Sequence, residues 1–253
     1  MFTRNRLTIL AVAAILGFAS TASAAILVDI NADGTNRTAT VADFEDAIGL
    51  ASGSFSGSSV VAFNSGGTGS GPFNETVSDI TIDVSSIGGD ADNWFGGGSS
   101  NNLLEDGFFA DPGVDQTITL SGSGLGLAAN TSYTLYLFAG RRADFNQSSS
   151  GANDGGHSTR FTFNSESIDA GAPIFTPSED FDETLGTVAF DFTTGGTAPT
   201  DLVVTWRGTG TGSTGADDSA FSGFALHVVV VPEPSSLLLA LVGLGLLAVR
   251  RRR

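Results

Sequence analysis

The stretch Ser132-Tyr133-Thr134-Leu135-Tyr136-Leu137-Phe138-Ala139 decides the fold class of this 253-residue chain. Large apolar side chains occupy every second position through Tyr133, Leu135 and Leu137. Because successive side chains of a strand point to opposite faces, this period of two predicts a β-strand with one face in a core. Turn-forming asparagine and glycine residues bound the stretch on its two sides.

Similar runs rich in valine, isoleucine, threonine and aromatic residues recur along the chain between Gly, Asn, Asp and Ser turns. The further predicted strands are Ile26–Ile30, Val77–Val84, Thr117–Leu120, Arg160–Phe163, Thr187–Phe192, Leu202–Trp206 and Phe221–Val230. Helical patterns are confined to two short segments, Asp43–Leu50 and Leu103–Phe109. Many strands without helical blocks between them predict an all-β domain, an antiparallel, jelly-roll-like β-sandwich over residues 25–231.

The charge of this predicted domain is strongly negative. Residues 25–231 contain 26 of the 27 acidic residues but only five arginines, and lysine is absent, so the net charge is −21. Such a surface repels phosphate groups, which excludes nucleic acid as a partner. It favours solubility and suits either bound divalent cations or a saline habitat. Because the chain has no cysteine, stability must come from packing and from any bound metal.

The N-terminus has the pattern of a secretory signal peptide. Arg4 and Arg6 precede an apolar run from Leu7 to Phe18, and the small residues Ala22-Ser23-Ala24 follow. We expect residues 1–24 to form a signal helix that signal peptidase removes before Ala25. An uncleaved N-terminal anchor is the alternative.

The last 22 residues form a second targeting segment. Pro232, Glu233 and Pro234 separate it from the domain, because proline cannot continue a ladder or a helix. The uncharged apolar run from Leu237 to Val249 predicts a short transmembrane helix of roughly 20 Å, against a hydrocarbon core of roughly 30 Å. The residues of a basic stop that stays on the cytoplasmic side of the membrane are Arg250, Arg251, Arg252 and Arg253.

The order of Pro-Glu-Pro, short hydrophobic helix and basic end resembles the PEP-CTERM sorting signal of bacterial envelope proteins. The resemblance implies that residues 232–253 are a sorting signal, which holds the chain in the membrane until an exosortase cleaves near Pro-Glu-Pro. It also implies export across the inner membrane to the cell envelope, cell surface or exterior of an organism that makes exopolysaccharide. An ordinary C-terminal membrane anchor is the alternative.

The domain itself carries a second, looser resemblance. Leu120-Ser121-Gly122, the strand from Asn130 to Arg141 and the closing Phe221-Ser222-Gly223-Phe224-Ala225-Leu226 are similar to passages of galactose-binding-like jelly rolls in exported bacterial proteins. The resemblance implies a sandwich in which loops at one end bind sugar in some members, whereas other members are structural. It transfers no binding residue to this chain.

The sequence predicts no catalytic site. The only histidines are His157 in a polar loop and His227 in a strand, and no Gly-x-Ser-x-Gly elbow is present for a serine nucleophile. Paired acids are abundant, but glycosidase chemistry needs two carboxyl groups that face one another across a groove. We therefore expect a protein that is not an enzyme, with a glycan hydrolase as a distant alternative.

A partial calcium loop begins the domain. Asp29-Ile30-Asn31-Ala32-Asp33-Gly34 matches the opening of such a loop, in which oxygens at alternate positions converge on the ion. The twelfth position is Thr40, where an EF-hand has a bidentate glutamate, so an EF-hand is excluded. The candidate ligands of a structural calcium ion are Asp29, Asn31, Asp33, Asp217 and Asp218. Polar turns are the alternative for both acidic segments.

Sugar binding requires exposed aromatic side chains that stack on pyranose rings, with polar groups that reach the hydroxyls. The glycine-rich segment after Asp92 and the polar segment after the strongest strand offer such residues. The candidate ligand-binding residues are Trp94, Arg141, Arg142 and Asp144. Trp94 could instead plug one end of the sandwich, and we expect Trp206 to be a packing residue.

The sequence therefore predicts an exported protein that binds carbohydrate, with extracellular polysaccharide as the ligand. A purely structural protein of the cell surface or biofilm matrix is the main alternative.

Overall fold

The computed structural model describes residues 25–31, 38–64, 71–91, 102–104, 107–110, 114–139, 159–171, 183–209 and 219–229. The predicted signal peptide, residues 1–24, and the predicted sorting segment, residues 232–253, lie outside these ranges, and so do their helices. Within the described residues, no helix is long and apolar enough to cross a membrane.

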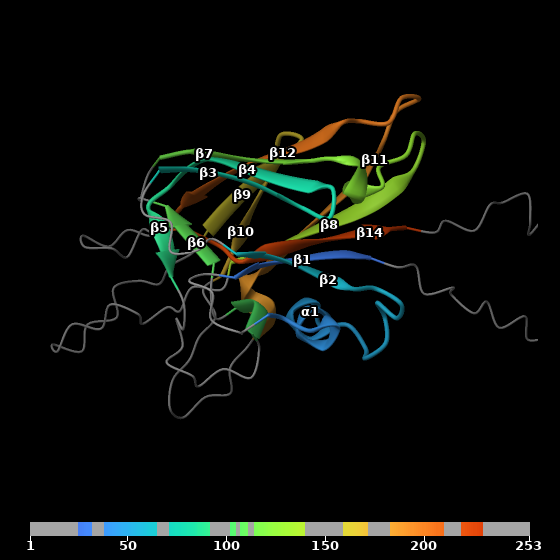
Figure 1. Ribbon diagram of the computed structural model, residues 1–253, viewed down its shortest axis with the longest axis horizontal. Coiled ribbons are helices and arrows are strands. Elements are labelled where there is room, and N and C mark those ends of the chain that lie inside the picture. Colours follow the sequence, from blue (N-terminus) through green and yellow to red (C-terminus); the bar gives the residue numbers. More distant parts are fainter. Residues whose placement is uncertain are drawn as a thin grey trace, which may run out of the picture.

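Two large sheets pack face to face, as Figure 1 shows. In order, the strands of the five-stranded sheet are β11 (Thr187–Thr193), β8 (Ser132–Phe138), β14 (Gly223–Val228), β1 (Ile26–Asn31) and β2 (Val60–Asn64). Those of the six-stranded sheet are β10 (Glu166–Ala170), β9 (Thr159–Phe163), β12 (Asp201–Gly208), β7 (Gln116–Ser121), β4 (Ile80–Ile87) and β3 (Gly71–Val77). A small third sheet consists of β13 (Ser219–Phe221), β6 (Gly107–Ala110) and β5 (Gly89–Ala91). The predicted all-β sandwich is confirmed.

The helical elements are short and lie around the sandwich. They are α1 (Val41–Ile48) and the 3-10 turns η1 (Asn102–Leu104), η2 (Ser123–Leu125) and η3 (Glu183–Gly186). The start of α1 is fixed by a capping box between Thr40 and Asp43, and its end by Gly49 in the left-handed conformation. The helix lies on the side of the five-stranded sheet that faces away from the other sheet (Figure 1). Its chain connection makes β1 and β2 a parallel pair, whereas the other paired strands run antiparallel.

The core lies between the inner faces of the two large sheets. Tyr133, Leu135 and Leu137 are at most 1% exposed, as the alternation in β8 predicts. The aromatic ring of Phe163 on β9 lies 5.9 Å from that of Phe190 on β11, which joins the two sheets. Trp206 is completely buried, so its predicted packing role is confirmed.

Three predicted elements are divided in the structure. Val77–Val84 was predicted as one strand, but Ser78 and Asp79 adopt positive φ and form the turn between β3 and β4. Phe221–Val230 is interrupted at Ser222, which separates β13 from β14. The predicted helix over Leu103–Phe109 is wrong, because this segment contributes the short turn η1 and strand β6.

The strand register gives the sandwich two distinct ends. Ala25 and Val229, the first and last described residues, lie at the end that we call the terminal end, where Ile26 pairs with Leu226. The opposite end, the distal end, contains Phe138, Thr159 and the ends of their partner strands. The distal end also contains the described strand ends that flank five undescribed segments, residues 32–37, 65–70, 140–158, 172–182 and 210–218.

Candidate binding site

A shallow depression of about 320 Å³ lies on the outer face of the six-stranded sheet. The residues that line it are Asp115, Arg160, Thr162, Ser167, Thr205, Trp206 and Arg207. Strand alternation explains this composition, because Phe161, Val204 and Trp206 point into the core while their neighbours point outward. The polar side chains of four neighbouring strands, β10, β9, β12 and β7, thereby meet on one surface.

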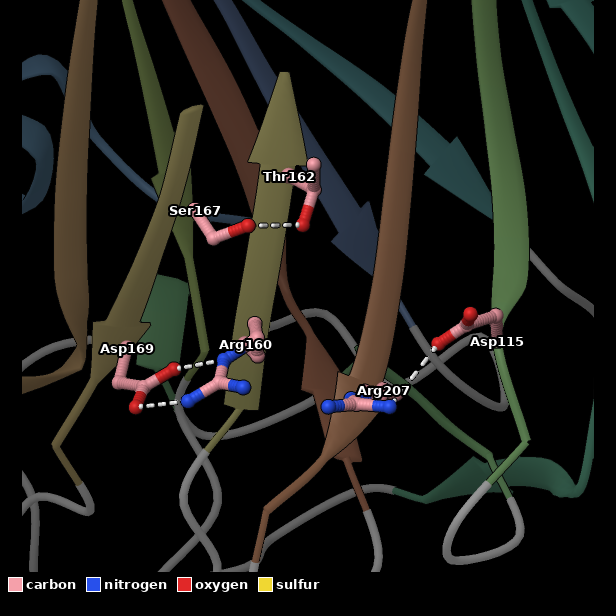
Figure 2. Close-up of polar contacts among 6 residues, drawn as sticks. All are labelled: Asp115, Arg160, Thr162, Ser167, Asp169 and Arg207. Atoms are coloured by element: carbon pink, nitrogen blue, oxygen red, sulfur yellow. Dashed lines mark hydrogen bonds and ion pairs between the residues drawn. The ribbon is translucent and has the colours of Figure 1, made fainter. Parts of the chain in front are cut away.

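Figure 2 shows a line of four charged side chains that we call the charge row, three of which line the depression. Its members, in spatial order, are Asp169, Arg160, Arg207 and Asp115. Asp169 pairs across the strands with Arg160, and Arg160 pairs with Arg207. Asp115 directly precedes β7 and lies beside Arg207. Two like charges therefore stand side by side in the middle of the row, with one carboxylate at each end.

Arg160 is fully engaged within the charge row. Its Nε donates to Oδ1 of Asp169 at 2.6 Å, and its Nη2 donates to Oδ2 at 2.8 Å. This bidentate hydrogen bond lowers the pKa of Asp169 and raises that of Arg160. Both side chains are exposed to solvent by more than a third, so the pair contributes little to stability.

Arg207 is much less engaged. Its Nη1 lies 3.7 Å from Oδ1 of Asp115, beyond hydrogen-bond distance, and its side chain is 40% exposed. Arg160 lies opposite Arg207 on the neighbouring strand, and like charges in this position repel. Arg160 therefore does not replace the missing acceptor for Arg207. Among the described residues, Arg207 makes no closer polar contact, and its guanidinium lies between Arg160 and Asp115 (Figure 2).

A second line, the hydroxyl row, runs beside the charge row and consists of Ser167, Thr162, Thr205 and Thr117. Ser167 and Thr162 face one another across β10 and β9, and their hydroxyl oxygens are 2.8 Å apart. Thr205 lies opposite both Thr162 and Thr117. The depression therefore has guanidinium donors along one line and hydroxyl donors and acceptors along the next.

These groups suit binding better than catalysis. A pair of hydrogen-bond donors from a guanidinium can hold neighbouring oxygens of a polyol or a carboxylate. In the part of the chain that the structure describes, no group of three or more His, Asp or Glu side chains could hold a metal ion. The depression therefore has the properties of a surface for a hydroxyl-rich ligand.

Two of the predicted calcium ligands lie in β1, on the face that α1 covers. Asp29 is completely buried, and its Oδ2 accepts a hydrogen bond from the backbone N–H of Ala39 at 2.8 Å. Its Oδ1 is buried and has no hydrogen-bond partner among the residues that the structure describes. Asn31 is 6% exposed, and its Nδ2 donates to the Thr38 hydroxyl. Thr40, which excludes an EF-hand, caps α1 instead.

The other candidate residues lie outside the described residues. They are the predicted ligand-binding residues Trp94, Arg141, Arg142 and Asp144, the predicted metal ligands Asp33, Asp217 and Asp218, the sorting residues Pro232, Glu233 and Pro234, and the basic stop Arg250, Arg251, Arg252 and Arg253. The strands that flank residues 140–158 and 210–218 meet at the distal end. The calcium and ligand-binding assignments therefore stay predictions.

The sequence-based predictions did not include Arg160 and Arg207. A signal for them exists in the sequence: they are two of only five arginines in residues 25–231, and each alternates with buried aromatic residues of its strand. An arginine at an outward position of a strand, in a strongly acidic domain, is therefore a sequence signal for a binding residue. Their proximity could not be predicted, because it depends on the order of β9 and β12 in the sheet.

Several solved structures share part of the architecture. The Family 16 Carbohydrate Binding Module-2 is 15% identical, with a TM-score of 0.21, and the match covers 51% of this chain and 77% of that chain. The CBM22-1 xylan-binding domain of Paenibacillus barcinonensis Xyn10C is 11% identical, with a TM-score of 0.25 and coverages of 65% and 91%. The enzymatically active domain of tailspike protein 4 from bacteriophage CBA120 is 12% identical, with a TM-score of 0.24 and coverages of 63% and 18%. At these TM-scores, none of them indicates a ligand or an activity for this chain.

No curated protein matches the sequence. Residues 230–253, in contrast, match the model of the PEP-CTERM protein-sorting motif. This match confirms the motif predicted from Pro-Glu-Pro, the apolar run and the terminal arginines: the chain carries a PEP-CTERM protein-sorting motif at its C-terminal end.

Proposed function

We propose that this protein is exported, processed by signal peptidase and an exosortase, and delivered to the cell envelope or exterior, where its domain binds polysaccharide without modifying it. The sorting motif over residues 230–253 supports the route. The polar depression on the six-stranded sheet supports the binding role. Exopolysaccharide of the same cell is the ligand that both features favour together.

The observation that carries the binding role is the state of Arg207. Among the described residues, its guanidinium reaches one acceptor, at 3.7 Å, whereas the neighbouring Arg160 holds a carboxylate through two short hydrogen bonds. A guanidinium with unused donors, beside a row of hydroxyl groups, can bind the vicinal oxygens of a sugar ring. The row of strands also gives an elongated surface, which suits a chain of sugars.

The position of the chain ends is compatible with presentation on a membrane. Val229, the last described residue before the sorting motif, lies at the terminal end of the sandwich. While the motif holds the protein in the membrane, the distal end points away from it. The predicted sugar-binding residues Arg141, Arg142 and Asp144 belong to a segment flanked by strands of that end, where we expect them to extend the binding surface.

Sedimentation of the full-length protein with insoluble polysaccharide from the producing cells tests this function. We expect the wild-type protein to bind, and Arg207→Ala to bind more weakly than Thr76→Ala, a control on the same sheet face outside the depression. Trp94→Ala tests whether the predicted tryptophan contributes to binding. Absence of wild-type binding would contradict the proposal, and self-assembly without polysaccharide would favour the structural matrix protein instead.

A further inference from the structure

The outer face of the five-stranded sheet is only partly covered. Near the distal end α1 packs on it, with the ring of Phe44 5.4 Å from that of Phe138 and the Thr187 hydroxyl donating to the carbonyl of Ala47. Closer to the terminal end, Phe55 lies 5.6 Å from the ring of His227. Between these covers, Ala189 and Asp191 of β11 are exposed and Tyr136 of β8 is half-buried, whereas Thr134 is buried.

Tyr136 is the aromatic residue of this open region. The register places Ala189 of β11 and Ala225 of β14 directly opposite it. Both neighbours are alanines, so no large cross-strand side chain covers the ring, and Ala189 on the edge strand is exposed. The side chain of Tyr136 is half-buried, and its hydroxyl makes no hydrogen bond with a described residue. A half-buried aromatic ring without a large cross-strand neighbour is a candidate stacking surface.

Polar groups lie in the next cross-strand row. Asp191, Thr134 and His227 are opposite one another on β11, β8 and β14. The Thr134 hydroxyl donates to Oδ1 of Asp191 at 2.6 Å, which fixes the carboxylate and leaves Oδ2 open to solvent. Burial lowers the pKa of His227, so its imidazole is neutral and can both donate and accept a hydrogen bond.

The negative charge of Asp191 favours an uncharged ligand over an anionic one. Burial, and then the negative charge of Asp191, raise the pKa of Tyr136, so its hydroxyl stays protonated and available as a donor. A carboxylate without a nearby described cation repels anionic sugars but accepts hydrogen bonds from sugar hydroxyls. The combination of ring, carboxylate and neutral imidazole therefore suits an uncharged sugar.

We propose that Tyr136, Asp191 and His227 form a binding subsite for a neutral pyranose, in which the sugar stacks on Tyr136 and two of its hydroxyls bond to Asp191 and His227. This inference rests on the proposed polysaccharide-binding function and extends it. The subsite lies on one outer face of the sandwich and the charge row on the other. One domain can thus hold polysaccharide on two opposite faces and cross-link it.

Saturation-transfer NMR on the full-length protein tests the subsite with methyl glycosides of glucose, galactose and mannose, and with methyl glucuronide as the anionic probe. We expect a neutral glycoside to bind and methyl glucuronide not to bind at this subsite. Tyr136→Ala should weaken the affinity for that glycoside on the order of tenfold, the equivalent of about 1.4 kcal/mol. Tyr136→Phe should retain stacking, and Thr76→Ala, on the other sheet and outside the depression, should leave the glycoside affinity unchanged.

A second variant avoids any effect of Tyr136 on folding. Ala189→Leu adds a side chain at an exposed position beside the ring and should block the stacking face, whereas Val203→Leu, at an exposed position of the other sheet, should not. Equal glycoside binding by wild type, Tyr136→Ala and Ala189→Leu would overturn the subsite. So would methyl glucuronide that binds as tightly as the neutral glycoside, if Tyr136→Ala weakens its binding.

Light scattering with soluble dextran separates this inference from the proposed function. A monomeric wild-type protein should cross-link the polymer, and either Ala189→Leu or Arg207→Ala should abolish cross-linking but not binding. If the wild-type protein binds the polymer and Ala189→Leu still cross-links it, the subsite at Tyr136 would be overturned. The proposed function would then remain. Glycoside binding that depends on Tyr136, without binding of any polysaccharide, would support the subsite and contradict the proposed function.

Discussion

The Oδ2 atom of Asp29 accepts a hydrogen bond from the backbone N–H of Ala39 at 2.8 Å, which ties β1 to the segment that begins α1. The Oδ1 atom is just as buried but has no partner. Burial raises the pKa of Asp29 to about 7, against the lowering effect of the Ala39 hydrogen bond and with a further increase from the charge of Asp43. A carboxylate in this position gains from either a proton or a cation, and the two cases give different predictions.

The first prediction concerns the cation. If calcium binds through Asp29 and Asn31, as the sequence predicts, calcium at 100 times its Kd should stabilise the fold by about 2.7 kcal/mol over the chelated protein. The measurement is the midpoint of thermal unfolding in calcium chloride and in EDTA. Asp29→Asn should remove the difference, whereas Asp79→Asn, in an exposed turn, should keep it. An unchanged wild-type midpoint would contradict a calcium site at Asp29.

The second prediction concerns the proton and is measured in EDTA. Because the folded-state pKa of about 7 lies above the ordinary value of 3.8, the folded protein holds the extra proton between these pH values. The free energy of unfolding should therefore fall as the pH rises through this window, by roughly 4 kcal/mol. The stabilising contribution is complete below the lower value and lost above the higher one.

Urea unfolding at pH 4.5, 6 and 8 measures this dependence. In Asp29→Asn this contribution of Asp29 to the pH-dependent decrease in the free energy of unfolding should be absent. Asp46→Asn, which changes an exposed acid on α1, should behave like the wild type. The same slope in wild type and Asp29→Asn would show that this carboxyl group does not titrate with the fold.

The sequence predicts the strands of the core well, because their signal is local. Tyr133, Leu135 and Leu137 alternate in the sequence and are buried together in the structure. The β3–β4 turn escaped prediction because Ser78 and Asp79 adopt positive φ without glycine, so Val77, the last residue of β3, was assigned to the same strand as β4. The short strands β5, β6 and β13 are too brief for a periodic pattern and form only through their tertiary pairing.

A third prediction tests the close approach of the chain near the β3–β4 turn. Gly122 has a φ of +104°, and an added Cβ would lie 2.1 Å from the carbonyl oxygen of Asp79. Gly122→Ala should therefore destabilise the fold by at least about 2 kcal/mol, because backbone must move. Gly126→Ala is the matched control: it also has positive φ, +58°, but no atom lies within 4 Å of its added Cβ, so its cost should be near 1 kcal/mol.

If chemical denaturation gave both glycine variants the same loss of stability, the contact between Gly122 and Asp79 would not exist as described. The comparison uses urea midpoints at constant slope, so that a changed unfolded state would be detected separately.

The candidate site was harder to predict than the core. The charge row joins Asp169, Arg160 and Arg207 of β10, β9 and β12 with Asp115, which precedes β7, and the order of these strands in the sheet does not follow their order in the chain. A local pattern identifies each arginine as outward-facing, but only the pairing of β9 with β12 makes them neighbours. The order of strands in a sandwich depends on long-range pairing, which one sequence does not reveal.

A fourth prediction separates binding from stability in the charge row. Arg160 and Asp169 are both substantially exposed, so Asp169→Asn should cost less than about 1 kcal/mol. Since the pKa of Asp169 is lowered in the fold, this small contribution is present at neutral pH and is lost as the pH falls through that lowered pKa. Thermal unfolding at pH 7 and pH 3 measures it. A cost of several kcal/mol at pH 7 would mean that the pair is a structural element of the fold.

The most direct test of the central claim is the affinity of the full-length protein for polysaccharide of the producing cells, measured by titration calorimetry with wild type, Arg207→Ala and Thr76→Ala. Loss of one charge-assisted hydrogen-bonding group should cost about 1.5–3 kcal/mol, so Arg207→Ala should bind at least tenfold more weakly at an unchanged melting temperature. Thr76→Ala should bind like the wild type. Equal affinities for all three proteins, or no binding by the wild type, would contradict the account.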